Sequence, residues 1–170
     1  MLKKAEILLS LMLVVSMASA ANAMMNLELR RGAGNTVDVY ATSGYVVGDD
    51  IYFAVVGDTS EVAVSGGSVS VLAPEDTVIY GNDARASGIC PPSMDGMWGF
   101  IGDVDGVPST GIGTYIGGIN WSMVGGATEA EIFLFGGPFE FYLLDTITVP
   151  EPTTFLFLAL GSLLLTRRRR

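Results

Sequence analysis

Residues 51–56 read Ile51-Tyr52-Phe53-Ala54-Val55-Val56, and this run decides the fold. It is continuously apolar and rich in β-branched and aromatic side chains, a composition typical of a strand that is buried on both faces. Gly48-Asp49-Asp50 precedes the run and Gly57-Asp58 follows it, and these residue types favour turns. The stretch therefore predicts a core strand with a turn at each end.

Shorter runs of alternating apolar and polar residues lie on both sides of this strand, separated by turns rich in glycine, asparagine and proline. They predict strands over residues 26–30, 37–40, 77–80, 94–101, 113–116, 119–124, 130–135 and 139–149. Val62 and Val64, then Val69 and Val71, predict two more strands, joined by a hairpin at Ser65-Gly66-Gly67-Ser68.

The composition of residues 24–149 indicates the fold class. This stretch holds 21 of the 22 glycines and has no convincing period of 3.6 residues, so we expect no helix in it. Many short strands in a domain of this size favour an all-β fold, an antiparallel β-sandwich rather than a barrel. In the last strand Asp145 interrupts the apolar positions, which predicts a bulge, an edge or a polar pocket there.

The N-terminus has the pattern of a secretory signal peptide over residues 1–23. Lys3 and Lys4 form a positive start, residues 7–17 are apolar apart from two serines, and small residues follow to Ala23. Small-x-small cleavage sites end at Ala20 and at Ala23, of which we favour Ala23. We therefore expect a signal helix that signal peptidase removes; a retained N-terminal anchor is the alternative.

The C-terminus combines a proline-flanked break, an apolar run and a basic end. The break is Val149-Pro150-Glu151-Pro152, since proline lacks a backbone N–H and restricts the residue before it. The apolar run predicts a membrane helix formed by Phe155, Leu156, Phe157, Leu158, Leu160, Leu163, Leu164 and Leu165. Residues 153–166 would span roughly 21 Å as a helix against a hydrocarbon core of about 30 Å, so the span is short.

A basic cluster, Arg167, Arg168, Arg169 and Arg170, ends the chain. Arginines are typical of the cytoplasmic face, and their long stems let a short helix reach it. The order of Pro150-Glu151-Pro152, helix and arginines resembles the PEP-CTERM sorting tail of Gram-negative bacteria. This resemblance implies that residues 150–170 are a sorting tail, which a membrane-embedded exosortase recognises and removes near the motif, with release of the protein or its transfer to the cell surface. An ordinary C-terminal membrane anchor is the alternative.

The charge of the central stretch bears on its partners. Residues 24–149 carry three arginines and sixteen acidic residues, a formal charge of −13. Such a surface repels phosphate backbones, so we expect no nucleic-acid partner. It is compatible with solubility outside the cell and with divalent cations.

The side-chain inventory restricts catalysis. The chain has no histidine and one cysteine, which excludes a Ser-His-Asp triad and nearly excludes zinc and iron–sulfur sites. Cys90 is a nucleophile, an intermolecular bridge or a small half-buried residue beside Pro91-Pro92; without histidine we favour the last. Asp103 with Asp105, or Glu129 with Glu131, could form the carboxylate pair of a glycosidase. We expect instead that these carboxylates are exposed and solvated. We therefore expect no enzyme.

Three further patterns could bind ligands. Asp103-Val104-Asp105-Gly106 is similar to the start of a calcium loop, but it lacks the later ligands, so an ordinary polar turn is favoured and no cofactor is expected. Trp98, Tyr115 and Trp121 could stack on sugar rings if exposed together, although core positions are the commoner use. Asn120-Trp121-Ser122 matches a glycosylation acceptor that chance also produces.

The central domain resembles cohesin-like or carbohydrate-binding-like sandwiches. Gly48-Asp49-Asp50-Ile51-Tyr52-Phe53, entering a core strand, and the closing Phe141–Val149 strand ahead of the tail carry this resemblance, from which we transfer no functional residue. The sequence as a whole predicts an exported, non-enzymatic cell-surface or extracellular-matrix protein. The alternative is a carbohydrate-binding or calcium-stabilised adhesion module, with surface polysaccharide as its partner.

Overall fold

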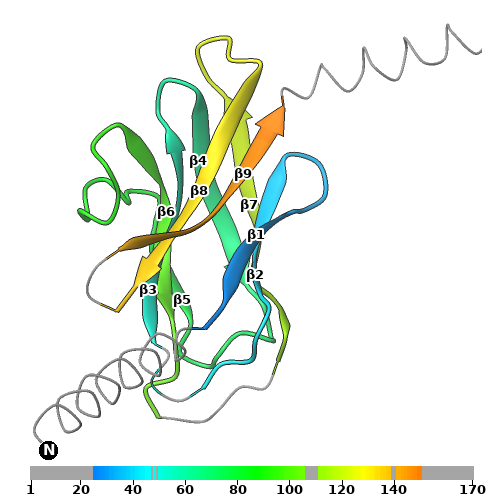
Figure 1. The fold of residues 1–170 in the computed structure, drawn as a ribbon, viewed down its shortest axis with the longest axis vertical. Coiled ribbons are helices and arrows are strands. Elements are labelled where there is room, and N and C mark those ends of the chain that lie inside the picture. Colours follow the sequence, from blue (N-terminus) through cyan, green and yellow to red (C-terminus); the bar gives the residue numbers. More distant parts are fainter. Residues whose placement is uncertain (1–24, 47, 49, 106–110, 139–140, 151–170) are drawn as a thin grey trace, which may run out of the picture.

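The computed structural model describes residues 25–46, 48, 50–105, 111–138 and 141–150, and these residues form two antiparallel sheets with no helix among them (Figure 1). The all-β prediction is confirmed. The predicted signal helix over residues 1–23 and the predicted membrane helix over 155–165 lie outside the described residues.

Nine strands follow one another within the described residues. They are β1 (Leu27–Arg31), β2 (Thr36–Ala41), β3 (Ile51–Asp58), β4 (Val62–Val69), β5 (Val78–Gly81), β6 (Met94–Ile101), β7 (Gly113–Met123), β8 (Glu129–Gly137) and β9 (Tyr142–Pro150). One sheet has the order β1-β2-β7-β4 and the other has the order β5-β6-β3-β8-β9. The two sheets pack face to face as a sandwich (Figure 1).

Strand β3 occupies the centre of the five-stranded sheet, between β6 and β8, as its apolar sequence predicts. Phe53 and Val55 belong to the core between the sheets, whereas Ala54 and Val56 belong to a second cluster with Ala84 and Ile89. The segment after β5 therefore covers the outer face of β3. Both faces of this strand lose water, which explains why its sequence does not alternate.

The core between the sheets consists of large apolar side chains from both layers. Its largest fully buried members are Tyr115, Phe53, Ile51, Met97, Ile101, Ile116, Ile119, Ile132, Leu134, Val37, Val39 and Val55. No disulfide can contribute, because Cys90 is the single cysteine. The burial of these side chains is therefore the main stabilising term of the sandwich.

The predicted hairpin at Ser65-Gly66-Gly67-Ser68 is wrong. Strand β4 runs without reversal from Val62 to Val69 and pairs with β7 along its length, from Val62 opposite Met123 to Val69 opposite Ile116. Gly66 and Gly67 have φ angles of 77° and 106°, a conformation that glycine adopts at little cost. Here both glycines lie within one continuous strand, and the chain does not reverse at them.

The two strands predicted over residues 113–116 and 119–124 are one strand, β7. Its register with β2 changes between Val37, opposite Ile119, and Val39, opposite Ile116. The extra residue of β7 forms a bulge at Gly117-Gly118, and the Gly118 N–H donates to Asp38 Oδ1 at 2.8 Å. A bulge keeps the ladder continuous where the sequence suggests a break.

The edges of the two sheets meet at β1 and β9, and Asp145 joins them. The register of β9 on β8 shifts between Asp145, opposite Leu134, and Leu143, opposite Phe135. Asp145 Oδ2 accepts the Leu29 N–H of β1 at 2.7 Å, and its Oδ1 accepts the Thr146 N–H at 2.8 Å. The bulge and edge predicted at Asp145 are confirmed, and the carboxylate links the two sheets.

Candidate functional site

The last strand ends within the proline-flanked break that the sequence marks. Strand β9 includes Val149, which is fully buried, and ends at Pro150, which lies opposite Glu129 of β8. This end is one residue beyond the predicted one. The strand tolerates Pro150 because β9 is an edge strand, where a missing N–H removes no required ladder bond.

A side chain of β1 holds this end of β9 in place. The Arg31 guanidinium donates from Nη2 to the Thr148 carbonyl oxygen at 2.5 Å. Beside it lies a small hollow of about 80 Å³, whose lining includes Arg31, Trp121, Val149 and Pro150. The first proline of the break is thus part of the folded domain, and Arg31 is a contact that sequence reasoning did not identify, because an isolated surface arginine carries no local signal.

Residues 148–170 match the family model of the PEP-CTERM protein-sorting motif. The chain carries a PEP-CTERM sorting motif at its C-terminus. This finding confirms the resemblance carried by Pro150-Glu151-Pro152 and the segments after it. Of the predicted tail residues, only Val149 and Pro150 lie within the described part; Glu151, Pro152, the apolar run and the arginine cluster lie outside it.

The membrane span is accordingly not among the described elements. Within the residues that the structure describes, no helix is long and apolar enough to cross a bilayer.

Comparison with solved structures finds cohesin domains. One is the sixth cohesin from scaffoldin B of Acetivibrio cellulolyticus, in complex with a variant Cel5 dockerin, with 12% sequence identity and a TM-score of 0.49 over 75% of this chain and 99% of that chain. Another is the complex of CaDoc0917 with CaCohA2, with 14% identity and a TM-score of 0.45 over 74% of this chain and 97% of that chain. A comparison with curated proteins finds no match.

The three aromatic residues considered for sugar stacking do not share a surface. Tyr115 is fully buried in the core and Trp121 is only 8% exposed. Trp98 lies in the cluster on the outer face of the five-stranded sheet. The interpretation that all three residues form one sugar-binding surface is therefore wrong, and Tyr115 and Trp121 are core residues. Asn120-Trp121-Ser122 lies within β7, which pairs with β2 and β4.

Trp98 has a different aromatic neighbour, Tyr80 of β5. Their ring centroids are 4.7 Å apart with an interplanar angle of 43°, and Tyr80 is 51% exposed. The Trp98 indole N–H donates to Asp83 Oδ1 at 2.8 Å. The pair presents an aromatic surface beside a carboxylate, which sequence reasoning missed because Tyr80 and Trp98 meet only through the pairing of β5 with β6.

Asp103 and Asp105 form a turn whose polar groups are largely used. Asp103 is 5% exposed, and its Oδ1 accepts the Asp105 N–H at 3.0 Å. The Asp103 N–H donates to the hydroxyl of buried Tyr45 at 3.2 Å, and that hydroxyl donates to Asp50 Oδ1 at 2.7 Å. Burial, followed by the bond to Asp50, raises the pKa of Tyr45. These bonds fit the polar-turn alternative.

No group of three or more acidic or cysteine side chains in the described residues is arranged to hold a metal ion. Residues 106–110, which follow the Asp103–Asp105 turn, lie outside the described part. The expectation that the domain needs no cofactor therefore stays a prediction, and calcium binding by Asp103 and Asp105 stays its alternative.

Cys90 is half-buried and packs against the outer cluster of the five-stranded sheet. Its thiol lies 3.4 Å from the Met94 carbonyl oxygen, to which it donates. Burial, with a further contribution from Asp95, raises the pKa of the Cys90 thiol, whereas Arg85 acts in the opposite direction. A thiol with a raised pKa stays protonated and is a poor nucleophile, so the structure favours the packing role.

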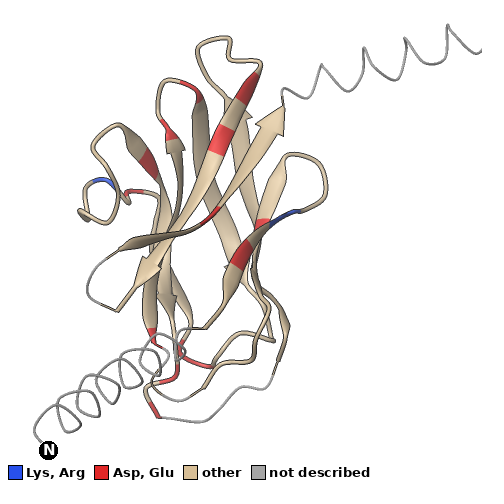
Figure 2. Cartoon of the chain, in the orientation of Figure 1, with Lys and Arg blue, Asp and Glu red and all other residues tan. Residues whose placement is uncertain are grey.

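Acidic residues are spread over both sheets and the loops (Figure 2). The described residues include three arginines, and each contacts an oxygen. Arg30 pairs with Glu28, Arg31 donates to the Thr148 carbonyl oxygen, and Arg85 pairs with Asp95. Glu129 and Glu131 are exposed on β8. Neither glutamate lines the hollow beside Arg31, and their exposure is that of solvated carboxylates.

Proposed function

We propose that the chain is an exported, non-enzymatic protein of the cell surface or extracellular matrix of a Gram-negative bacterium. In this proposal a signal helix over residues 1–23 directs export, and a membrane helix over 155–165 holds the protein in the inner membrane. An exosortase then recognises Pro150-Glu151-Pro152 and removes the tail. The match of residues 148–170 to the PEP-CTERM sorting motif is the observation that carries the proposal.

The geometry of the tail junction supports this order of events. Strand β9 ends at Pro150, and four residues, 151–154, separate it from the apolar run. Four extended residues reach at most about 14 Å, so before cleavage the sandwich must stay close to the membrane surface. A membrane-embedded enzyme can reach such a junction, whereas a soluble protease would meet the folded domain and the bilayer on either side.

The non-enzymatic part of the proposal is supported by the side chains. The chain has no histidine, the single thiol has a raised pKa, and Tyr115 and Trp121 serve the core. The described residues thus suit a stable domain with an acidic surface better than they suit acid–base or nucleophilic catalysis.

The sorting proposal is tested by following tail removal in a host that contains its exosortase. The wild-type chain should yield a shortened product whose mass corresponds to loss of the tail. A Pro150→Ala/Pro152→Ala variant should keep its tail and accumulate in the inner membrane. A Thr153→Ala/Thr154→Ala variant, with two changes just outside the motif, should be processed like wild type. Equal processing of all three chains would overturn the proposal.

A second candidate function is polysaccharide binding at the Tyr80–Trp98 pair. The exposed Tyr80 ring, the adjacent Trp98 ring and the Asp83 carboxylate are the kinds of group that stack on sugar rings and accept their hydroxyl protons. Because Tyr80 and Trp98 are neighbours on the sheet surface, they would cover one sugar residue rather than a long chain.

Affinity electrophoresis of the exported protein through gels that contain neutral or acidic polysaccharides tests this function. Retardation by one polysaccharide, lost in Tyr80→Ala and kept in Tyr142→Ala, would support it. Tyr142 is the matched control, because it is a similarly exposed tyrosine on β9. The absence of retardation in every gel, or equal loss in both variants, would sink it.

A further inference from the structure

Arg31 differs from the other two arginines of the described residues. Each of those two forms an ion pair with a carboxylate, whereas Arg31 donates to the Thr148 carbonyl oxygen at 2.5 Å. A carbonyl oxygen accepts a hydrogen bond but does not neutralise the charge of a guanidinium group. Although the stretch around it carries a formal charge of −13, Arg31 forms no ion pair with a carboxylate of the described residues.

Arg31 lines the hollow of about 80 Å³ at the end of the sandwich where β9 ends. The rest of the lining comes from the turn between β1 and β2, from Trp121 of β7, and from Val149 and Pro150 of β9. Since a water molecule takes about 30 Å³ in the liquid, the hollow has room for about two or three waters or for the end of one side chain. Glu151, the residue that follows Pro150 in the chain, therefore begins next to this hollow.

The sequence around Glu151 restricts the direction of its side chain. Pro152 follows Glu151, and the residue before a proline favours an extended backbone. Side chains alternate between the two faces of an extended chain, so an extended Glu151 would point to the same side as Ile147 and Val149. Val149 belongs to the core between the sheets, and Ile147 packs against that core. This side of β9 is also the side on which Val149 lines the hollow.

The Arg31 side chain is close enough to pair with Glu151. Consecutive residues of a strand are about 3.3 Å apart, so Glu151 lies roughly 10 Å along the chain from Thr148, whose carbonyl oxygen Arg31 binds. The long side chains of arginine and glutamate can together bridge this separation. The guanidinium group has further donors besides the one on Thr148, and a carboxylate accepts from them more strongly than a neutral oxygen does.

We propose that the hollow beside Arg31 is a binding site for the Glu151 side chain, and that this pairing holds the Pro-Glu-Pro motif against the sandwich until the exosortase draws it out. This role of Arg31 rests on the proposed function, since it concerns the timing of tail removal. An enzyme can recognise the motif only in the fraction of chains in which Glu151 is free. Arg31 is thus a positioning residue that slows tail removal.

Carboxyl NMR of the chain with its tail, labelled with ¹³C-glutamate and purified in detergent from a host without exosortase, tests the pairing. Glu151→Gln identifies the Glu151 signal. A carboxylate beside an arginine titrates below the ordinary glutamate value of about 4.3. The pKa of Glu151 should therefore be low in the wild type, rise in Arg31→Gln and fall again in Arg31→Lys, which keeps the charge.

Arg30→Gln is the matched control, because Arg30 is the neighbouring exposed arginine of β1 and pairs with Glu28. It should leave the pKa of Glu151 unchanged. Arg31 is exposed, so its replacements should fold. An equal pKa of Glu151 in the wild type and in Arg31→Gln would overturn the proposal.

The rate of tail removal in a host with its exosortase tests the consequence of the pairing. Arg31→Gln should be processed about two- to fivefold faster than the wild type, the population change expected on loss of an exposed ion pair. Arg30→Gln should be processed at the wild-type rate. Equal or slower processing of Arg31→Gln would contradict the proposal. Failure of the sorting proposal is a separate result, seen as normal processing of Pro150→Ala/Pro152→Ala, and the pKa of Glu151 decides the pairing without the exosortase.

Discussion

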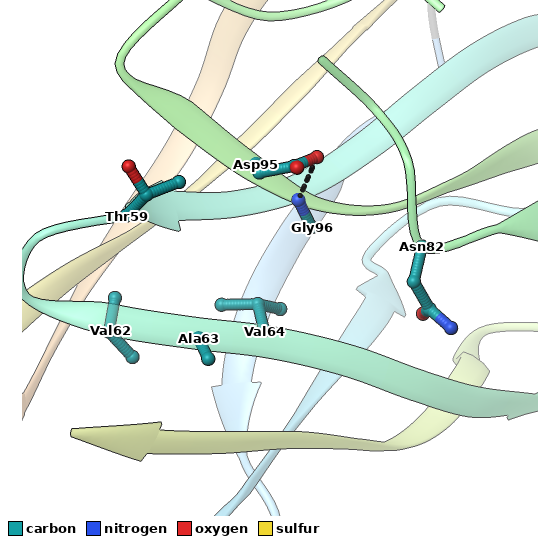
Figure 3. Close-up of a pocket in the computed structure, with 7 residues that line it drawn as sticks. All are labelled: Thr59, Val62, Ala63, Val64, Asn82, Asp95 and Gly96. Atoms are coloured by element: carbon teal, nitrogen blue, oxygen red, sulfur yellow. Dashed lines mark hydrogen bonds between the residues drawn. The ribbon is translucent and has the colours of Figure 1, made fainter. Parts of the chain in front are cut away.

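The two lateral sides of the sandwich differ. On the sealed side, where β1 meets β9, Asp145 and Arg31 connect the edges of the two sheets through hydrogen bonds to backbone groups. On the opposite side, β4 lies beside a hollow of about 210 Å³ that Asp95 and Gly96 of β6 also line (Figure 3). The Asn82 side chain accepts the Gly66 N–H of β4 there at 2.8 Å. The comparison shows that hydrogen bonds from side chains to backbone groups connect the two sheets on both sides. The hollow beside β4 is larger than the hollow of about 80 Å³ beside Arg31.

The largest effect is expected on the sealed side. Asp145→Ala removes the acceptor of the Leu29 and Thr146 N–H groups, and a part-buried donor left without a partner costs about 1–3 kcal/mol. Urea unfolding of the exported protein should report this loss, together with faster hydrogen exchange in β1. Asp145→Asn keeps a side-chain oxygen and should lose less; identical stability of the alanine variant and wild type would contradict the role of this link.

A smaller loss of stability is expected within β4, on the opposite side of the sandwich. Gly67→Ala places a Cβ at a φ of 106° and 3.0 Å from the Ile119 side chain, and a left-handed conformation costs a non-glycine residue about 1–2 kcal/mol. Gly117→Ala on β7 is the control, since its Cβ would make ordinary contacts at 3.4 Å or more. Urea midpoints that fall equally in both variants would refute a special backbone requirement at Gly67.

A pH-dependent effect is expected at Asp58, the last residue of β3. The Ser60 hydroxyl, and then the Ser60 N–H, hold the pKa of Asp58 below its ordinary value. A depressed folded pKa stabilises the protein above the unfolded value of about 3.9, and this stabilisation disappears as the pH falls through the folded pKa. The stability difference between wild type and Asp58→Asn should therefore be present at neutral pH and vanish in acid.

Ser60→Ala provides the check on this assignment, because it removes the hydroxyl donor. The pKa of Asp58, followed by NMR titration of its carboxyl carbon, should rise in this variant. An unchanged pKa would show that another group is responsible.

The smallest effect is expected for calcium. The Asp103 carboxylate already accepts the Asp105 N–H, and the turn is held by Tyr45 and Asp50 as well. The melting midpoint of the exported protein should thus be the same with calcium and with chelator. A ligand that binds only the folded state raises the midpoint, so a clear rise with calcium would support the calcium-binding alternative at Asp103 and Asp105.

The sequence predicts those strands well whose buried positions show as a local pattern of apolar residues. The run from Ile51 to Val56 and the eight-residue strand from Met94 to Ile101 are confirmed. Glycine positions are the exception, because glycine permits a turn, a bulge or a twisted strand. Gly66-Gly67 and Gly117-Gly118 interrupt the pattern in the same way, and only their pairing partners on neighbouring strands decide that the chain continues.

The sequence by itself determined the all-β class, the acidic charge and the sorting motif, since composition, alternation and an ordered tail are local properties. The tertiary structure decided which residues face solvent and which edges are closed. Trp121 is buried in the core, and Trp98 packs against Tyr80. Asp145 accepts a hydrogen bond from the Leu29 N–H, which is distant in sequence. Such contacts join residues that are far apart in sequence, and they depend on strand order and register, which local patterns leave open.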